Sequence, residues 1–213
     1  MTKQDLKTLL SNGLRQLNLA QPLDEQQQST LIKYVKLLDK WNKSYNLTAV
    51  RKPEQMVTRH IIDSLSICPY LRGKRILDVG TGAGLPGIPL AIAFRERQFT
   101  LLDSNNKKTR FVTQAVSELE LSNVDVVQSR VENFQSPELF DTIITRAYSA
   151  IGDMVEQTSH LLAADGTFLA MKGTNPVAEL DGLPSTYKVE QNHIIKVPEL
   201  DEERHLLEIK AVI

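Results

Sequence analysis

The sequence predicts an α/β protein: a sheet of parallel strands with helices on both faces, preceded by a helical extension and ended by an antiparallel hairpin. Up to about residue 71, apolar residues recur at helical steps. From Gly73 onward, short apolar runs alternate with helical stretches, which is typical of strands joined by crossover helices. We therefore expect residues 1–71 to form an N-terminal extension and residues 72–213 to form the sheet domain.

The extension should contain three helices. In each of them, apolar residues recur at three- and four-residue steps and so share one face. Pro53 suits the first turn of the third helix, where an N–H has no helical partner. The apolar positions are Leu6, Leu9, Leu10, Leu14 and Leu17, then Leu31, Val35, Leu38 and Trp41, then Met56, Val57, Ile61 and Leu65.

Five apolar runs after Gly73 predict parallel strands, and the helical stretches between them should cover both faces of the sheet. Two further apolar runs at the end of the chain are separated only by PELDEER, so these two strands should pair antiparallel. The expected strands are 75–79, 99–103, 124–129, 141–145, 166–172, 187–197 and 205–212, and the expected helices of this domain are 85–95, 107–119 and 151–162.

The first expected strand ends in a glycine-rich loop, ILDVGTGAGLPGIPL, at residues 76–90. Gly80, Gly82 and Gly84 follow the strand directly. A tight turn alone would need only one or two glycines, because each one costs backbone entropy. The loop therefore predicts a ligand that lies against the backbone.

Two ligand classes compete for this loop. A dinucleotide would place its pyrophosphate on the helix N-terminus, and S-adenosylmethionine would lie against Gly80 and Gly82; in both cases Asp103 would hold the ribose. Asp78, expected near the loop mouth, would repel a pyrophosphate but suits an amino group and a sulfonium. Pro86 removes an N–H that a phosphate could use. The terminal hairpin also differs from the symmetric double unit of dinucleotide-binding domains. These features favour S-adenosylmethionine.

The charge of the chain is unevenly distributed. Residues 1–110 hold 18 Lys and Arg against 9 Asp and Glu, whereas residues 111–213 hold 7 against 17. A basic half suggests an anionic partner such as RNA, DNA or an acidic surface. The alternative is a solvated, lysine-rich helical surface.

A set of motifs is shared with a known family. They are DVGTGAGLPGIPL, LLDSNNKKTRF, VQSRVENF, TRAYS and AMKG, together with KWNKSYNLTAV and RHIIDSL in the extension and ERHLLEIK at the end. With them, the chain resembles the bacterial 16S ribosomal RNA guanine-N7 methyltransferase G family, once called glucose-inhibited division protein B. The resemblance spans nearly the whole chain, and LPGIPL with RHIIDSL is far more specific than the glycines alone.

The resemblance implies a class I S-adenosylmethionine-dependent methyltransferase fold with a helical N-terminal extension. It also implies methyl transfer to N7 of a single guanine of 16S rRNA, guanosine 527 in rRNA numbering. The cofactor contacts that it implies are Gly80, Leu85, Val131, Glu132 and Arg146. The glycine loop and the strand after it predict further cofactor contacts at Asp78, Gly82, Gly84 and Asp103.

Guanine N7 is an exposed lone pair, so its attack on a sulfonium methyl needs positioning but no obligatory general base. We therefore expect no titration of kcat by a catalytic base between about pH 6 and 9. Arg146 can only donate hydrogen bonds, so its expected role in catalysis is orientation, by gripping guanine O6, a phosphate or the cofactor carboxylate. A surface salt bridge is its alternative role. Tyr148 could stack on the base or pack in the core.

The expected RNA contacts are basic. Lys107 and Lys108 open a helix, and Lys172 ends a strand at the same edge of the sheet, where phosphates of the substrate could lie. For the lysine pair, a solvated helix face is the alternative. The candidate RNA contacts are Arg59, His60, Lys107, Lys108, Arg110, Lys172 and Arg204, with Tyr148 as a stacking residue.

The remaining titratable residues suggest no further chemistry. His60 could be a packing histidine bonded to Asp63 or Ser64 instead of an RNA contact. Four scattered histidines and one cysteine give no metal-ligand spacing. The single cysteine, Cys68, should pack in the core. Because one cysteine allows no internal disulfide, the sequence favours the cytoplasm.

Other functions remain open. One is a methyltransferase acting on a small molecule or a protein, and another is a non-catalytic RNA- or ribosome-binding module. The expected partner is 16S rRNA in the small ribosomal subunit or in an assembly precursor. No membrane contact is expected, because no stretch approaches the ~20 uncharged apolar residues of a membrane helix, and nothing in the sequence demands a dimer, so a monomer is expected.

Overall fold

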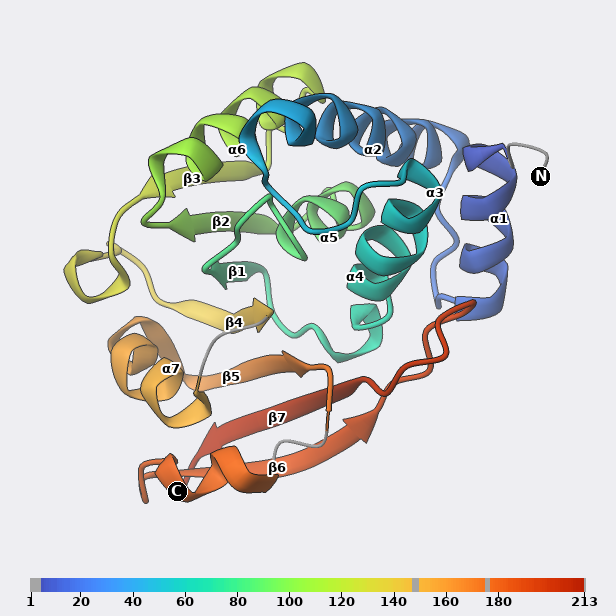
Figure 1. The fold of residues 1–213 in the computed structure, drawn as a ribbon. Coiled ribbons are helices and arrows are strands. Elements are labelled where there is room, and N and C mark those ends of the chain that lie inside the picture. Colours follow the sequence, from blue (N-terminus) through green and yellow to red (C-terminus); the bar gives the residue numbers. More distant parts are fainter. Residues whose placement is uncertain (1–4, 147–149, 175–176, 213) are drawn as a thin grey trace.

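The computed structural model describes residues 5–146, 150–174 and 177–212 (Figure 1). They form a seven-stranded sheet with the strand order β3-β2-β1-β4-β5-β7-β6. The pairings from β3 to β5 are parallel, and β7 runs antiparallel between β5 and β6. The predicted parallel sheet with a terminal hairpin is confirmed. The strands are β1 (Arg75–Val79), β2 (Gln98–Asp103), β3 (Val124–Gln128), β4 (Phe140–Arg146), β5 (Leu162–Lys172), β6 (Tyr187–Ile194) and β7 (His205–Ala211).

Helices cover both faces of this sheet, as the alternating pattern predicts. On one face, side chains of α5 and α6 share a hydrophobic core with the N-terminal helices. On the other face, Met154 and Val155 of α7 pack with Phe140 and Phe168 of the sheet. The helices of the sheet domain are α5 (Gly87–Ala93), α6 (Asn106–Glu118) and α7 (Ile151–Thr158), with short 3₁₀ turns at Val131–Asn133, Ser159–Leu161 and Val177–Gly182.

The N-terminal extension begins with two regular helices and ends in an irregular one. Pro53 is the first residue of the third helix, as predicted. The middle of that helix, Val57–Ile62, is wound as a π-helix, a form that is frequent at functional sites. The elements are α1 (Leu6–Leu17), α2 (Glu25–Tyr45), α3 (Pro53–Met56), the π-helical segment, α4 (Asp63–Leu65) and a 3₁₀ turn at Cys68–Tyr70.

The extension is packed as part of the sheet domain. Leu31 and Tyr34 of α2 are buried in the same cluster as Ile88 of α5 and Phe111 of α6. The side-chain amide of Gln27 also donates to the carbonyl of Ile92 at 2.9 Å, at the end of α5. One core therefore joins the extension to the helices that follow the glycine loop, and it can hold that loop from behind.

Several element boundaries differ from those expected. The helix after the glycine loop begins at Gly87 and not at 85, because the amides of Gly84 and Leu85 both donate to the carbonyl of Thr81 in a turn. Strand β5 begins at 162 and not at 166: Leu162 pairs with Phe140 before a register shift in the β4–β5 ladder. Strand β6 ends at Ile194. In the part of the chain that the structure describes, no helix is both long and apolar enough to cross a membrane.

Candidate functional site

The glycine loop has the backbone geometry that its composition predicts. Gly80, Gly82 and Gly84 have φ angles of 69°, 61° and 85°, in the left-handed region that glycine adopts at little cost. A Cβ on Gly84 would come within 2.5 Å of the side chain of Ile88, whereas one on Gly82 would meet only the carbonyl of Gly80, at 3.8 Å. The loop is therefore closed toward α5 and open near Gly82, where a ligand could approach.

Asp78 lies beneath the loop and not at its mouth. Its side chain is fully buried, and its Oδ2 accepts hydrogen bonds from the hydroxyl of Thr81 at 2.7 Å and from the amide of Gly87 at 2.9 Å. Its Oδ1 is buried without a hydrogen-bond partner among the described residues. Burial raises the pKa of this carboxyl to about 6. The structure thus places Asp78 as an anchor of the loop, which corrects the expected position.

Tyr34 supports the loop from the other side. Its hydroxyl, fully buried in α2, donates to the carbonyl of Ala83 at 2.6 Å. This role could not be predicted from the sequence, because 49 residues separate the tyrosine from the loop that it holds. The helical extension therefore fixes the backbone of the expected cofactor site.

Asp103 closes the front of the loop, at the end of β2. Its Oδ2 accepts from the amide of Gly82 at 2.9 Å, and its Oδ1 accepts from the amide of Asn105 at 2.8 Å. The carboxylate is 8% exposed, and Nζ of Lys108 lies 3.9 Å from it. Each carboxylate oxygen keeps a lone pair for a further donor such as a ribose hydroxyl.

A cavity of about 290 Å³ lies at the ends of β1, β2 and β3, and we call it the glycine-loop cavity. It brings together four predicted residues, Gly80, Asp103, Val131 and Glu132. Leu85 is buried and, like Gly82 and Gly84, is not part of the lining. The lining also contains residues that were not predicted, although all but Gln157 lie in the shared motifs: Val79, Leu102, Ser104, Ser129, Arg130 and Gln157.

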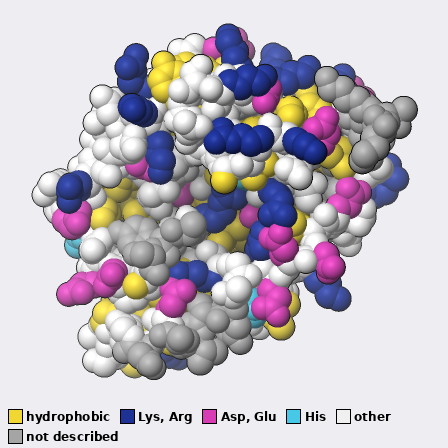
Figure 2. Space-filling view, in the orientation of Figure 1, with side chains coloured by type: hydrophobic (Ala, Val, Ile, Leu, Met, Phe, Trp, Pro, Cys, Tyr) yellow, Lys and Arg dark blue, Asp and Glu magenta, His cyan; other side chains and the backbone are white. Residues whose placement is uncertain are grey.

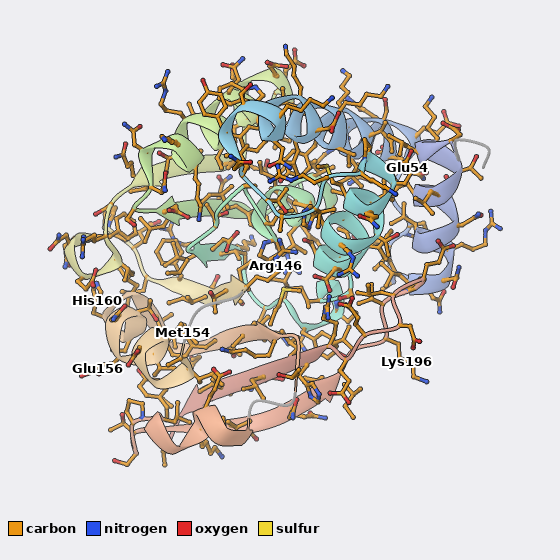
Figure 3. All side chains as sticks on the ribbon, in the orientation of Figure 1. Glu54, Arg146, Met154, Glu156, His160 and Lys196 are labelled. Carbon is orange, nitrogen blue, oxygen red and sulfur yellow. The ribbon has the colours of Figure 1, made fainter. Side chains whose placement is uncertain are left out.

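A second cavity, of about 350 Å³, lies at the ends of the neighbouring strands β4 and β5. Arg59 and Asp63 of the extension reach it from one side, Arg146 ends β4 beside it, and Arg204 precedes β7. We call it the arginine cavity. Figure 3 places Arg146 near the middle of the molecule, between the end of β4 and the α3–α4 helices, and Figure 2 shows Lys and Arg side chains mixed with Asp and Glu in the middle of this face. Its other lining residues are Val50, His60, Met171, Lys172 and Gly173.

Ion pairs connect the arginines of this cavity. Asp63 accepts from Arg146 at 3.3 Å through one oxygen and from Arg204 at 3.0 Å through the other. Glu202 pairs with Arg59 and, at 3.0 Å, with Arg204. Arg146 also donates to the main-chain carbonyl of Arg59 at 3.3 Å. Arg146 is thus part of a ring of charges, and it lines the arginine cavity and not the glycine-loop cavity.

His60 is not bonded to Asp63 or Ser64, as one interpretation of the sequence expected. Its Nε2 lies 2.9 Å from the hydroxyl of Thr48, and its ring is 5% exposed. Burial, with the charge of Arg146 second, lowers the pKa of His60 to about 4. The imidazole is therefore neutral at pH 7 and offers no positive charge to a phosphate.

The lysine candidates fall into two groups. Lys107 is exposed and Lys108 is 40% exposed on its side chain, both on the first turn of α6. Lys172 is only 9% exposed, and its amino group is paired with Glu179. The predicted stacking residue, Tyr148, lies outside the described residues. No group of three or more His, Cys, Asp or Glu within the described ranges could hold a metal ion.

Comparison with known proteins places the chain in a family. Residues 27–207 match the family model described as rRNA small subunit methyltransferase G. The ribosomal RNA small subunit methyltransferase G of Stutzerimonas stutzeri is 52% identical over 200 residues, which cover 93% of this chain and 92% of that protein. The protein of the same name from Alteromonas mediterranea is 49% identical over 208 residues, 98% of each chain.

Solved structures support the fold. The glycopeptide N-methyltransferase MtfA, solved with S-adenosyl-L-homocysteine, aligns with a TM-score of 0.62 at 10% identity, over 72% of this chain and 87% of that one. A methyltransferase from Aquifex aeolicus described as SAM dependent gives 0.57 at 16% identity, over 84% and 97%. The architecture is that of class I S-adenosylmethionine-dependent methyltransferases. With this fold and these relatives, the chain belongs to the rRNA small subunit methyltransferase G family.

Proposed function

We propose that the protein transfers a methyl group from S-adenosylmethionine to N7 of guanosine 527 in 16S rRNA. Family membership supports a ribosomal RNA methyltransferase. The observation that carries the proposal is the pair of cavities at the ends of neighbouring strands, one beside the glycine loop and the other lined by arginines. Such a pair suits a small donor and a polyanionic acceptor that must meet at one edge of the sheet.

The glycine-loop cavity and the loop beside it fit the methyl donor. Asp103 can accept a hydrogen bond from a ribose hydroxyl, and the open backbone at Gly82 allows close approach. The unpartnered Oδ1 of Asp78 adds negative charge beneath the loop, which favours an amino group and a sulfonium over a pyrophosphate. When bound, S-adenosylmethionine supplies an electrophilic methyl on a cationic sulfur. We further infer cofactor contacts at Gly80, Val131 and Glu132, because they line this cavity.

The arginine cavity suits a nucleotide acceptor. Arg146 ends β4, the strand next to β1, so it lies close to the loop and acts electrostatically on Asp78. Its guanidinium can donate to guanine O6 or to a phosphate, and it orients the base without removing a proton. Arg59 and Arg204 extend the positive surface away from the loop, where the phosphates flanking the target nucleotide can bind.

We infer that the physiological substrate is the small ribosomal subunit or an assembly precursor, and that the protein acts as a monomer in the cytoplasm. The target base must leave its stack to reach a cavity at the sheet edge, so the substrate should present it unpaired.

The test uses methyl-labelled S-adenosylmethionine and small ribosomal subunits from cells that lack this protein. Label is mapped in the RNA by cleavage at 7-methylguanine. We expect one labelled guanine in 16S rRNA with the wild type and none with Gly82→Asp, which fills the open side of the loop and adds a charge beside Asp103. Gly182→Asp is the matched control, because a Cβ there meets nothing within 4 Å.

Label in a protein or a small molecule would contradict the proposed acceptor. Label at another RNA position would contradict only the choice of guanine. Absence of cofactor binding by the wild type would contradict the assignment of the glycine-loop cavity.

A further inference from the structure

Two carboxylates hold the arginines of the arginine cavity, and they differ in burial. Asp63 is 4% exposed on its side chain and contacts Arg146 and Arg204. Glu202 is 40% exposed and contacts Arg59 and Arg204. Arg204 is thus shared between a buried and an exposed acid.

Asp63 is built into the fold. It starts α4 in the extension, and its two oxygens each hold an arginine from the sheet domain, 83 and 141 residues away in sequence. A charge this deeply buried is stable only with its partners in place, and removing one side of such a pair is strongly destabilising. Asp63 therefore fixes the spacing of the two guanidinium groups, whose side chains remain 23% and 17% exposed.

Glu202 is instead exposed to water. It lies in the segment between β6 and β7, and its two oxygens face the guanidinium of Arg59. Arg59 and Arg204 hold its pKa below the usual range. Exposed ion pairs of this kind contribute little to stability, because water competes for both charges.

A carboxylate between two arginines has the shape and charge that a phosphate offers. Arginine binds both groups through two parallel N–H···O contacts, and an RNA phosphate is also a permanent anion. The place that Glu202 occupies is therefore suited to one phosphate of the RNA backbone.

We propose that Asp63 is a positioning residue that sets Arg146 and Arg204 for the RNA, and that Glu202 occupies a phosphate site which the RNA takes over on binding. This inference rests on the proposed RNA methyltransferase function. It assigns opposite roles to two acids that touch the same arginine: one prepares the site and the other competes for it.

The two roles can be separated from a simple charge effect. Asp63→Asn and Glu202→Gln each remove one negative charge from the same cluster. If only the electric field mattered, both would strengthen the binding of RNA. The proposal instead predicts opposite changes.

The experiment measures methyl transfer to small subunits from cells lacking the protein, as a function of subunit concentration and of salt. We expect Glu202→Gln to lower the KM for subunits about two- to fivefold at unchanged kcat, since one competing exposed ion pair is lost. We expect Asp63→Asn to raise this KM about tenfold or more, because two arginines lose their common partner. The affinity for S-adenosylmethionine and the melting midpoint are measured for every variant.

Two further variants control for charge and for folding. Glu203→Gln removes a neighbouring carboxylate that is 72% exposed and lies 3.8 Å from His205. This variant should lower the KM for subunits less than Glu202→Gln does, because only long-range charge changes. Asp63→Glu keeps the charge but lengthens the side chain, so it should also raise the KM. This second variant decides the role of Asp63 if Asp63→Asn does not fold.

An equal decrease of KM in Glu202→Gln and Glu203→Gln would overturn the competing role of Glu202, and so would an increase in Glu202→Gln. A wild-type KM in Asp63→Glu, or a lowered KM in Asp63→Asn, would overturn the positioning role of Asp63. Failure of the wild type to methylate RNA in the subunits would refute the proposed function itself. The wild-type reaction therefore distinguishes that failure from a failure of the roles given to Asp63 and Glu202.

Discussion

The two cavities at this edge of the sheet are built in different ways. The glycine-loop cavity lies beside a loop whose backbone is held by two buried acids, Asp78 and Asp103, which accept hydrogen bonds from its amides. The arginine cavity is made of long charged side chains that hold one another. The first site has a backbone fixed by hydrogen bonds, which suits one small molecule. The second is an adjustable charged surface, which suits a flexible polyanion.

The largest expected effect concerns the backbone of the glycine loop. Gly84→Val puts a branched side chain at a φ of 85° and against Ile88. We expect the free energy of unfolding to fall by roughly 3 kcal/mol and the affinity for S-adenosylmethionine to be lost. Chemical denaturation and calorimetric titration measure the two quantities, with Gly182→Val as the control. Wild-type cofactor affinity in Gly84→Val would show that cofactor binding does not need the fixed backbone of the loop.

The buried acid of the loop makes stability depend on pH. The pKa of Asp78 is raised from 3.8 to about 6, so its contribution is fully present below the unfolded value and is lost as the pH rises through 6. Relative to Asp78→Asn, the wild type should lose roughly 3 kcal/mol of unfolding free energy from about pH 4 to pH 7. Denaturant melts over this range measure the difference.

Asp39→Asn, which removes an acid from a surface pair with Lys43, is the control for this pH series. A difference between wild type and Asp78→Asn that does not change with pH would contradict the raised pKa.

A smaller effect tests the link between the extension and the loop. Tyr34→Phe removes one hydrogen bond of 2.6 Å and leaves the carbonyl of Ala83 without this donor. We expect a loss of about 1–2 kcal/mol in unfolding free energy and a weaker affinity for S-adenosylmethionine. Tyr45→Phe, at a tyrosine that is 44% exposed, should change neither quantity. Equal effects of the two substitutions would show that the extension does not brace the loop.

The smallest effect concerns the edge of the charged surface. Lys107→Ala/Lys108→Ala should weaken RNA binding and reduce the slope of log affinity against log salt by roughly 1–2. Filter binding of small subunits at several salt concentrations measures this slope. An unchanged slope would remove both lysines from the RNA-binding surface.

The difference between the two cavities also explains which residues could be predicted from the sequence. The glycine loop and Asp103 lie within 30 residues of one another and follow consecutive strands, so local patterns were sufficient to predict them. The burial of Asp78 could not be predicted, since strand alternation does not say that the loop folds back over its side chain. The support from Tyr34 depends on how α2 packs.

The arginine cavity was predicted only as separate basic residues. Arg59, Arg146 and Arg204 come from three distant segments, and Asp63, which joins two of them, gave no signal of its own. The sequence also does not report that His60 is buried and neutral or that Lys172 is paired with Glu179, so both stay predictions as RNA contacts. Tertiary packing decides which charges face solvent.

The most direct test that the two cavities bind different molecules uses the double variant Arg59→Gln/Arg204→Gln. Its KM for small subunits and its Kd for S-adenosylmethionine are measured. The account predicts that the KM for small subunits rises about tenfold or more, because phosphate contacts are lost, while the Kd for S-adenosylmethionine stays at the wild-type value. A weakened affinity for S-adenosylmethionine with an unchanged KM for subunits would contradict it, since the arginines would then belong to the cofactor site.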